Sequence, residues 1–266
     1  MAALALTLSA TAQTPSWIRR NSISPDGSTI AFSYKGDIYT VPASGGQARQ
    51  LTSNQAFDSN PIWTRDGKNI VFISYRESGK DIYITPENGG VPRRITNLPG
   101  NETPLAVLPD GSILFSWYNG SIESESYGNF PGTAQLYRTD IHGAAPELVT
   151  SLPVKALSIN SEGTIIYEDY KGYEDELRKH HTSSVTRDIW KYVPAAGDKR
   201  LCITSNGSFT RLSDYKGEDR NPVFAADGDT FYYLSERDGK TSNVYRSSLS
   251  APQTSVQLTF ETRNPV

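Results

Sequence analysis

A short turn motif recurs five times along the chain and constrains its fold more than any other feature. In each copy an acidic residue and a glycine separate two runs rich in β-branched and aromatic residues, as Asp66 and Gly67 do between residues 62–63 and 70–72. Glycine adopts the positive φ that a tight turn needs, so each copy predicts a β-hairpin. In this copy a third strand is expected at residues 81–84 and a fourth at 94–96.

The turn glycines set the number of such units. They are Gly27, Gly67, Gly111, Gly163 and Gly228, and the interval between successive glycines widens along the chain. Repeats of this size cannot bury their apolar faces alone and must stack on their neighbours. We therefore predict an all-β fold, a β-propeller of four-stranded antiparallel blades. Five near-complete blades are expected at about residues 17–53, 57–97, 103–150, 154–205 and 218–260.

Two local assignments follow from the repeat. The fourth strand of the fourth blade is expected at residues 201–204, where the single cysteine, Cys202, is interpreted as a small buried hydrophobe. Residues 264–266 repeat the Asn-Pro opening of blades two and five, so a sixth blade is expected to begin at 262–266. An incomplete ring of this kind would make the chain a fragment of a longer protein; the alternative is a closed five-bladed ring that ends at Val266.

The first twelve residues are expected to lie outside the propeller, which would then occupy 13–266. They form a short apolar run that ends in a small-x-small pattern at Ala10 and Ala12, as in the last part of a secretory signal. This predicts a remnant signal peptide and an exported chain, periplasmic or extracellular, with a disordered tail as the alternative. No segment approaches the roughly 20 apolar residues of a membrane span. A net charge of −3 argues against nucleic acid as a partner.

Two long insertions interrupt the repeat, at residues 116–132 and 167–182, each between the second and third strands of its blade. Equivalent connections lie on one face of a propeller, and long loops in a compact fold are often functional. We expect a peptide-contact surface there. Its candidate residues are Trp117, Tyr118, Arg178, His180, His181 and Arg187.

The other polar residues of these insertions favour structural interpretations. His180 and His181 are adjacent, so their side chains diverge and cannot easily share one metal ion. The carboxylates are interpreted as a solvated, partly self-paired charge run; they are Glu168, Asp169, Glu174, Asp175 and Glu176. The acidic residues of the five turns are interpreted as turn-forming residues rather than calcium ligands.

Catalytic motifs are missing from the sequence. It contains no G-x-S-x-G elbow, no H-E-x-x-H pair and no phosphate-binding G-x-x-x-x-G-K-[ST] loop. We therefore predict no catalytic residue, no cofactor and no metal in this chain.

The repeat resembles a known family. Residues 23–27, Ile-Ser-Pro-Asp-Gly, followed by Ile-Ala-Phe, Asp-Ile-Tyr and Gly-Gly, are similar to the WD40-like propeller repeats of the tricorn protease and of the Tol system. Residues 180–190 and 216–222 resemble the propeller of exported bacterial tricorn-like serine peptidases. In that family a PDZ module and a peptidase domain of the C-terminal-processing type follow the propeller.

The resemblance implies a function without implying a catalytic site here. It points to a non-catalytic propeller that binds peptides or gates their access to a serine peptidase domain of the same polypeptide. None of the family's catalytic residues corresponds to a position of this chain. The alternatives are a periplasmic interaction propeller of the Tol type, with protein partners, and the propeller of a prolyl-oligopeptidase-like enzyme.

Overall fold

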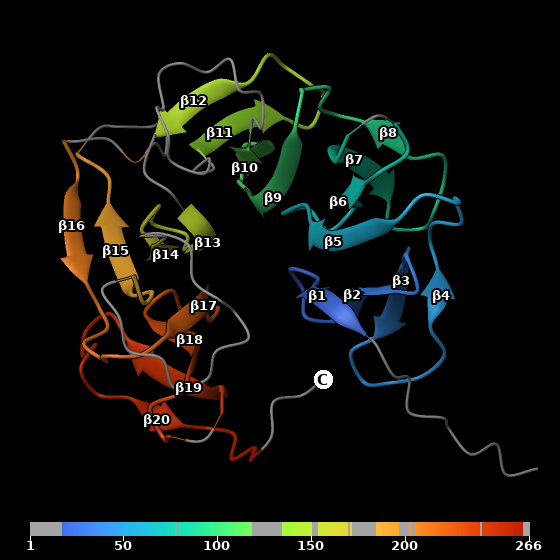
Figure 1. Ribbon diagram of the computed structural model, residues 1–266. Helices are drawn as coiled ribbons and strands as arrows, with labels where there is room; N and C mark the ends of the chain where they lie inside the picture. The colour runs from blue at the N-terminus through green and yellow to red at the C-terminus, as the bar shows by residue number, and fades with distance from the viewer. Residues whose placement is uncertain are drawn as a thin grey trace, which may run out of the picture.

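The computed structural model describes residues 18–77, 79–118, 135–150, 154–169, 171, 185–196, 203, 206–239 and 241–262. Within them five four-stranded antiparallel sheets follow one another around a central space, with the first strand of each sheet innermost (Figure 1). This confirms the predicted β-propeller. Residues 1–12, and all but the first residue of the predicted sixth-blade start at 262–266, lie outside the described residues, so both assignments stay predictions.

Each blade is built from four consecutive strands. Blade one contains β1 (Arg19–Ile23), β2 (Thr29–Tyr34), β3 (Asp37–Pro42) and β4 (Arg49–Gln50). Blade two contains β5 (Asp58–Trp63), β6 (Asn69–Ser74), β7 (Asp81–Pro86) and β8 (Arg93–Arg94). Blade three contains β9 (Asn101–Val107), β10 (Ser112–Tyr118), β11 (Gln135–Asp140) and β12 (Glu147–Thr150). Blade four contains β13 (Val154–Ile159), β14 (Ile165–Asp169), β15 (Ile189–Val193) and β16 (Ser208–Arg211). Blade five contains β17 (Asp219–Phe224), β18 (Thr230–Ser235), β19 (Asn243–Ser248) and β20 (Val256–Gln257).

The hairpin turns have the chemistry that the repeat predicts. All five turn glycines have a positive φ, from 70° at Gly67 to 82° at Gly163. Asp66 accepts hydrogen bonds from the Thr64 hydroxyl at 2.6 Å and from the Lys68 backbone N–H at 3.1 Å. These bonds, that of Thr64 foremost, lower the pKa of Asp66. The acidic side chain therefore stabilises the turn, as predicted.

Blade four replaces that aspartate with an asparagine placed earlier in the turn. The Asn160 side-chain oxygen accepts hydrogen bonds from the backbone N–H groups of Glu162 at 3.1 Å and Thr164 at 2.9 Å. The Thr164 N–H, which corresponds to that of Lys68 in blade two, is thus satisfied without a carboxylate, so Glu162 can stand where the other turns have Asp.

Apolar faces of neighbouring blades pack together and form the core. Between blades one and two, Ala31, Ile38 and Leu51 pack against a surface that includes Trp63 and Phe72. Comparable clusters join blades two to three, three to four and four to five. Burial of one large apolar side chain contributes about 1.5–3 kcal/mol, so each junction is a major source of stability.

Blades five and one each present one face that no described neighbour covers. Leu258 donates its backbone N–H to Val244 as Leu51 does to Ile38, so the two leucines are equivalent, yet Leu258 is 42% exposed and Leu51 only 9%. In the described chain the inner strands of successive blades contact each other, whereas β17 of the last blade and β1 of the first do not make comparable contact.

The outer strand of blade four differs from its expected position. The strand that pairs with β15 is β16, at Ser208–Arg211, where Trp190 pairs with Arg211 and Val193 with Ser208. Of the expected strand at 201–204 only Ile203 is described, so the interpretation of Cys202 as a buried hydrophobe stays a prediction. All four residues of β16 are exposed, so the strand lacks the apolar pattern by which sequence analysis finds strands. Ile203, from the expected strand, is instead buried in the cluster between blades three and four.

Candidate functional site

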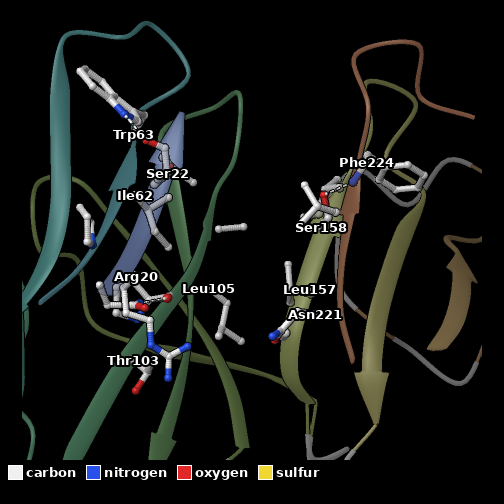
Figure 2. Close-up of a pocket in the computed structure, with 18 of the residues that line it drawn as sticks. Arg20, Ser22, Ile62, Trp63, Thr103, Leu105, Leu157, Ser158, Asn221 and Phe224 are labelled. Atoms are coloured by element: carbon white, nitrogen blue, oxygen red, sulfur yellow. Dashed lines mark hydrogen bonds between the residues drawn. The ribbon is translucent and has the colours of Figure 1, made fainter. Parts of the chain in front are cut away.

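A central cavity of about 1500 Å³ lies between the blades of the described chain. The innermost strands of all five blades line it: β1, β5, β9, β13 and β17. Leu105 of β9 and Leu157 of β13, on neighbouring inner strands, add apolar surface to the lining, and Ser22 and Ser158 add polar groups (Figure 2). The wall therefore combines apolar surface with scattered hydrogen-bonding groups, as ligand sites commonly do.

All five inner strands shift register against the second strand of their blade, and in three of them the shift coincides with a residue in the left-handed region. The pairing of β1, β5 and β17 with the second strand of each blade shifts register at Arg20, Asn60 and Asn221, respectively. These three residues have φ values of 46°, 57° and 51°, in the left-handed region that Asn tolerates better than most residues. A bulge bends its strand and redirects its side chains, so the repeated Asn-Pro motif is explained by the geometry of the channel wall.

At the end of the cavity that carries the hairpin turns, polar side chains bond to backbone carbonyls of other blades. The Arg65 guanidinium donates to the carbonyls of Val107 at 3.3 Å and Ile159 at 3.1 Å, and so reaches from blade two to blades three and four. Asn160 donates to Gly228 of blade five at 2.9 Å. This end, which we call the turn end, ties the inner strands together.

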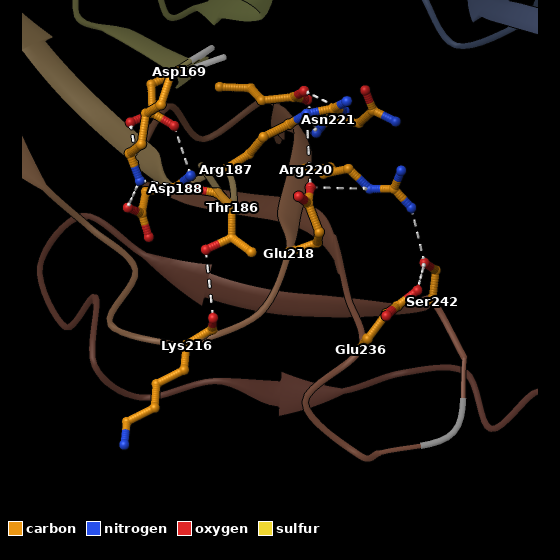
Figure 3. A network of polar contacts seen from close by, with 12 residues as sticks. Asp169, Thr186, Arg187, Asp188, Lys216, Glu218, Arg220, Asn221, Glu236 and Ser242 are labelled. Carbon is orange, nitrogen blue, oxygen red and sulfur yellow. Dashed lines mark hydrogen bonds and ion pairs between the residues drawn. The ribbon is translucent and has the colours of Figure 1, made fainter. Parts of the chain in front are cut away.

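The opposite end, which we call the loop end, contains buried ion pairs (Figure 3). Arg187 lies 3.0 Å from the Glu168 carboxylate and 3.7 Å from that of Glu218. Glu168 also accepts the backbone N–H of Asn221 at 2.9 Å, which connects blade four to the bulge of blade five. Burial raises the pKa of Glu218, although Arg187 and Arg220 oppose this shift.

The charge of the cavity wall differs in sign from that of the whole chain. One carboxylate, Glu168, lines the cavity among the described residues, against six cationic side chains: Arg20, Arg65, Lys80, Lys155, Arg187 and Arg220. The chain as a whole has a net charge of −3. A narrow space with a low-dielectric wall concentrates such a field, which favours anionic groups, although the buried Glu218 behind the wall offsets part of the charge of Arg187 and Arg220.

The structure places only part of the predicted peptide-contact surface. Arg187 is buried and lines the cavity. The Trp117 indole donates to the Pro99 carbonyl at 2.8 Å and packs edge-to-face on Tyr137, away from the cavity lining. The side chain of Tyr118, and all of Arg178, His180 and His181, lie outside the described residues. Their role as peptide contacts stays a prediction.

The interpretation of the carboxylate run as solvated is wrong for its first two members. Glu168 and Asp169 belong to β14, and Glu168 is 1% exposed. Asp169 accepts hydrogen bonds from the Asp188 backbone N–H at 2.7 Å and the Trp190 indole at 3.1 Å. Both carboxylates thus have partners from a distant segment, which the local sequence cannot reveal. The other members of the run, Glu174, Asp175 and Glu176, lie outside the described residues.

Sequence reasoning missed Arg20, Lys80 and Thr103, which line the loop end of the cavity. They come from blades one, two and three, so no local spacing relates them. The available signal was the repeat itself, which places Arg20 and Thr103 on the first, innermost strands of their blades. Over the described chain, no group of three or more His, Cys, Asp or Glu side chains could hold a metal ion. No helix in that part of the chain has the length and hydropathy to cross a membrane.

The family model of the tricorn protease N-terminal β-propeller domain matches residues 15–266. The chain belongs to this family. The tricorn protease homolog 1 of Streptomyces coelicolor is 22% identical over 227 residues, which make up 84% of this chain and 19% of that protein. An uncharacterized protein of Agrobacterium fabrum is 30% identical over 135 residues, or 49% of this chain and 42% of that protein. The tricorn-type propeller thus covers less than half the length of either curated relative.

Solved structures agree in fold with this tricorn-type propeller. The crystal structure of the tricorn protease superposes with a TM-score of 0.72 at 19% identity, over 93% of this chain and 23% of the other. The crystal structure of TolB from Acinetobacter baumannii gives a TM-score of 0.62 at 16% identity, over 91% of this chain and 52% of the other. At such identities these likenesses establish the propeller fold alone.

Proposed function

We propose that this propeller is a non-catalytic domain that binds extended peptides in its central channel and so controls their access to a peptidase domain. The observation that carries the proposal is the cavity of about 1500 Å³ lined by the inner strands of all five blades. Its apolar wall can take side chains, and its hydroxyl and amide groups can bond to a peptide backbone.

The peptidase connection rests on the family. Relatives of this chain carry the names of peptidases, among them the tricorn protease homolog of Streptomyces coelicolor. No nucleophile motif occurs in the present sequence, so the hydrolytic group is proposed to belong to another domain of the same polypeptide. A fluorophosphonate, which reacts with activated serines, should label the whole protein and leave the 266-residue chain unlabelled. Labelling of the propeller chain itself would contradict a non-catalytic role.

The proposed location is outside the cytoplasm. The apolar residues before the small-x-small pattern at Ala10 and Ala12 support it. Fractionation of cells that make the whole protein should recover it from the periplasm or the medium, with Gln13 as its first residue. Recovery from the cytoplasm with the leader retained would refute export.

The channel proposal can be tested with two leucine-to-tryptophan variants of the same blade. Leu105 lies on the cavity wall, whereas Leu148 lies on the outermost strand, β12, and is 54% exposed. Fluorescence anisotropy would follow binding of a pool of labelled, unstructured dodecapeptides. Leu105→Trp narrows the channel and should weaken binding at least tenfold, while Leu148→Trp should leave it unchanged. Equal binding by both variants would place the peptide elsewhere, as an interaction propeller with partners on its outer surface would.

A further inference from the structure

Two cationic side chains at the loop end of the channel lie close together without a carboxylate partner in the described part of the molecule. Lys80, which follows β6, and Arg20, in the bulge of β1, both line the cavity. The Lys80 ammonium donates to the Thr103 hydroxyl at 2.7 Å, and no ion pair within 4 Å joins either cation to a described carboxylate. Figure 2 shows Arg20 and Thr103 together at this end of the cavity.

The neighbouring acidic side chain, Glu102, does not neutralise these cations. It precedes Thr103 on β9 and is fully buried, where its carboxyl group accepts a hydrogen bond from the Thr96 hydroxyl at 3.0 Å. Burial, with the neighbouring charge of Asp81, raises the pKa of Glu102 to about 8. Glu102 is therefore mainly uncharged at neutral pH. Burial and the charge of Arg20 in turn lower the pKa of Lys80, and Glu102, when ionised, opposes this shift.

The geometry has the properties of a carboxylate site. Three donors converge from three blades: the Arg20 guanidinium, the Lys80 ammonium and the Thr103 hydroxyl, whose oxygen accepts from Lys80 and leaves its own proton free to donate. Charge-assisted hydrogen bonds of this kind are the stronger ones in proteins. Since Arg20 is exposed and Lys80 partly so, an incoming group can reach both without displacing a packed element.

We propose that Arg20, Lys80 and Thr103 bind a side-chain carboxylate of an extended peptide, so that the channel prefers acidic segments. The inference rests on the proposed peptide-binding function and adds the class of peptide. An aspartate or glutamate side chain supplies the two acceptor oxygens that the three donors require. The positive field of the channel wall favours the same charge along the approach.

The test compares two peptides that differ in charge alone. Both are dodecapeptides, N-acetylated and C-amidated, so that no terminal charge contributes; one carries glutamate at four positions and the other glutamine at the same positions. Isothermal titration with the propeller chain should show at least tenfold tighter binding of the glutamate peptide at low salt, as expected for one or more charge-assisted hydrogen bonds. The preference should shrink as salt is raised.

Variants of the site separate binding from folding. Lys80→Met should abolish the preference while the affinity for the glutamine peptide stays the same, and Lys80→Arg should retain it. Arg20→Asn introduces the residue that blades two and five have at the equivalent bulge, so it removes the charge and keeps the backbone geometry. Lys68→Met, an exposed lysine in the turn of blade two at the other end of the channel, is the matched control and should change nothing.

Three results would overturn the inference. Equal binding of both peptides, unchanged in Lys80→Met, would remove the acidic preference and leave the peptide-binding function intact. Binding of neither peptide would refute both. Inorganic phosphate that binds as tightly as the glutamate peptide at the same residues would show a general anion site with no selectivity for peptides.

Discussion

The two ends of the channel are built from the same strands and use arginine in opposite ways. At the turn end, Arg65 bonds to backbone carbonyls of two other blades. At the loop end, Arg187 is enclosed between two buried glutamates, while Arg20 and Lys80 have no described carboxylate partner. Charge at the turn end therefore joins the blades, whereas charge at the loop end is partly left available for a ligand. The predictions below separate these roles.

The largest effect is expected from Arg187→Met. It leaves Glu168 and Glu218 buried without their cation, and removal of one partner of a buried ion pair costs about 3–5 kcal/mol. Urea denaturation should show this loss in the free energy of unfolding. The control is Arg211→Met, since Arg211 is 46% exposed beside Asp188 and its loss should cost less than about 1 kcal/mol. Similar values for the two variants would show that the loop-end pairs do not stabilise the ring.

Arg65→Met probes the turn end. Loss of its two hydrogen bonds to Val107 and Ile159 should lower the free energy of unfolding by about 1–2 kcal/mol, measured in the same way. Its effect on peptides should differ from that of Lys80→Met: the preference for glutamate over glutamine should persist. If Arg65→Met were as stable as the parent, or lost the preference for the glutamate peptide, the proposed difference between the two ends would be contradicted.

Gly67→Ala tests whether the turn of blade two needs glycine at its positive φ. Gly67 has a φ of 70°, and the nearest atom to an added Cβ would be the Pro25 ring at 3.8 Å, so steric contact contributes nothing. Because alanine disfavours this left-handed backbone conformation, the variant should lower the free energy of unfolding by about 1 kcal/mol, measured by thermal or chemical denaturation. Gly67→Asn should recover part of this loss because Asn tolerates the left-handed region. An unchanged midpoint for the alanine variant would contradict the assignment of glycine to a conformational role.

Glu102→Gln is expected to change how stability depends on pH. The pKa of Glu102 is raised to about 8 in the folded chain, so the native state holds a proton that the unfolded state has released, and its contribution to stability falls as pH rises from about 5 to 8. In Glu102→Gln, the free energy of unfolding measured at several pH values across that range should not show this decrease. Asp81, Arg94 and Lys80 surround the carboxyl group and stay unchanged in the variant.

The same variant links pH to ligand choice. Above pH 8 the ionised Glu102 partly neutralises Lys80, so the parent should lose some of its preference for the glutamate peptide, while Glu102→Gln should keep it. Parallel behaviour of the two proteins from pH 7 to 9 would show that Glu102 does not influence the site.

The sequence predicted the architecture because each blade carries its own local signal. The turn glycines and the apolar residues of strands such as β6 are encoded within a few residues, and five copies reinforce one another. The outer strand β16 was misplaced since its exposed residues have no such pattern. Edge strands need only satisfy backbone hydrogen bonds, which many sequences can do.

The site was far less predictable. Arg187 was identified as a candidate, but its partners Glu168 and Glu218 are distant from it in the sequence, one well before it and the other well after. Arg20, Lys80 and Thr103 meet only because the ring brings three blades to one end of the cavity. Contacts of this kind depend on how blades are arranged, so they follow from the fold and not from any motif.

The most direct test of channel binding is a photo-crosslinking map. A glutamate-containing peptide with a benzophenone side chain would be irradiated with the propeller chain, and the modified residues identified by mass spectrometry. Binding in the channel predicts crosslinks on the inner strands β1, β5, β9, β13 and β17, suppressed by excess unlabelled peptide. Crosslinks confined to the outer strands β4, β8, β12, β16 and β20, or none at saturating peptide, would contradict it.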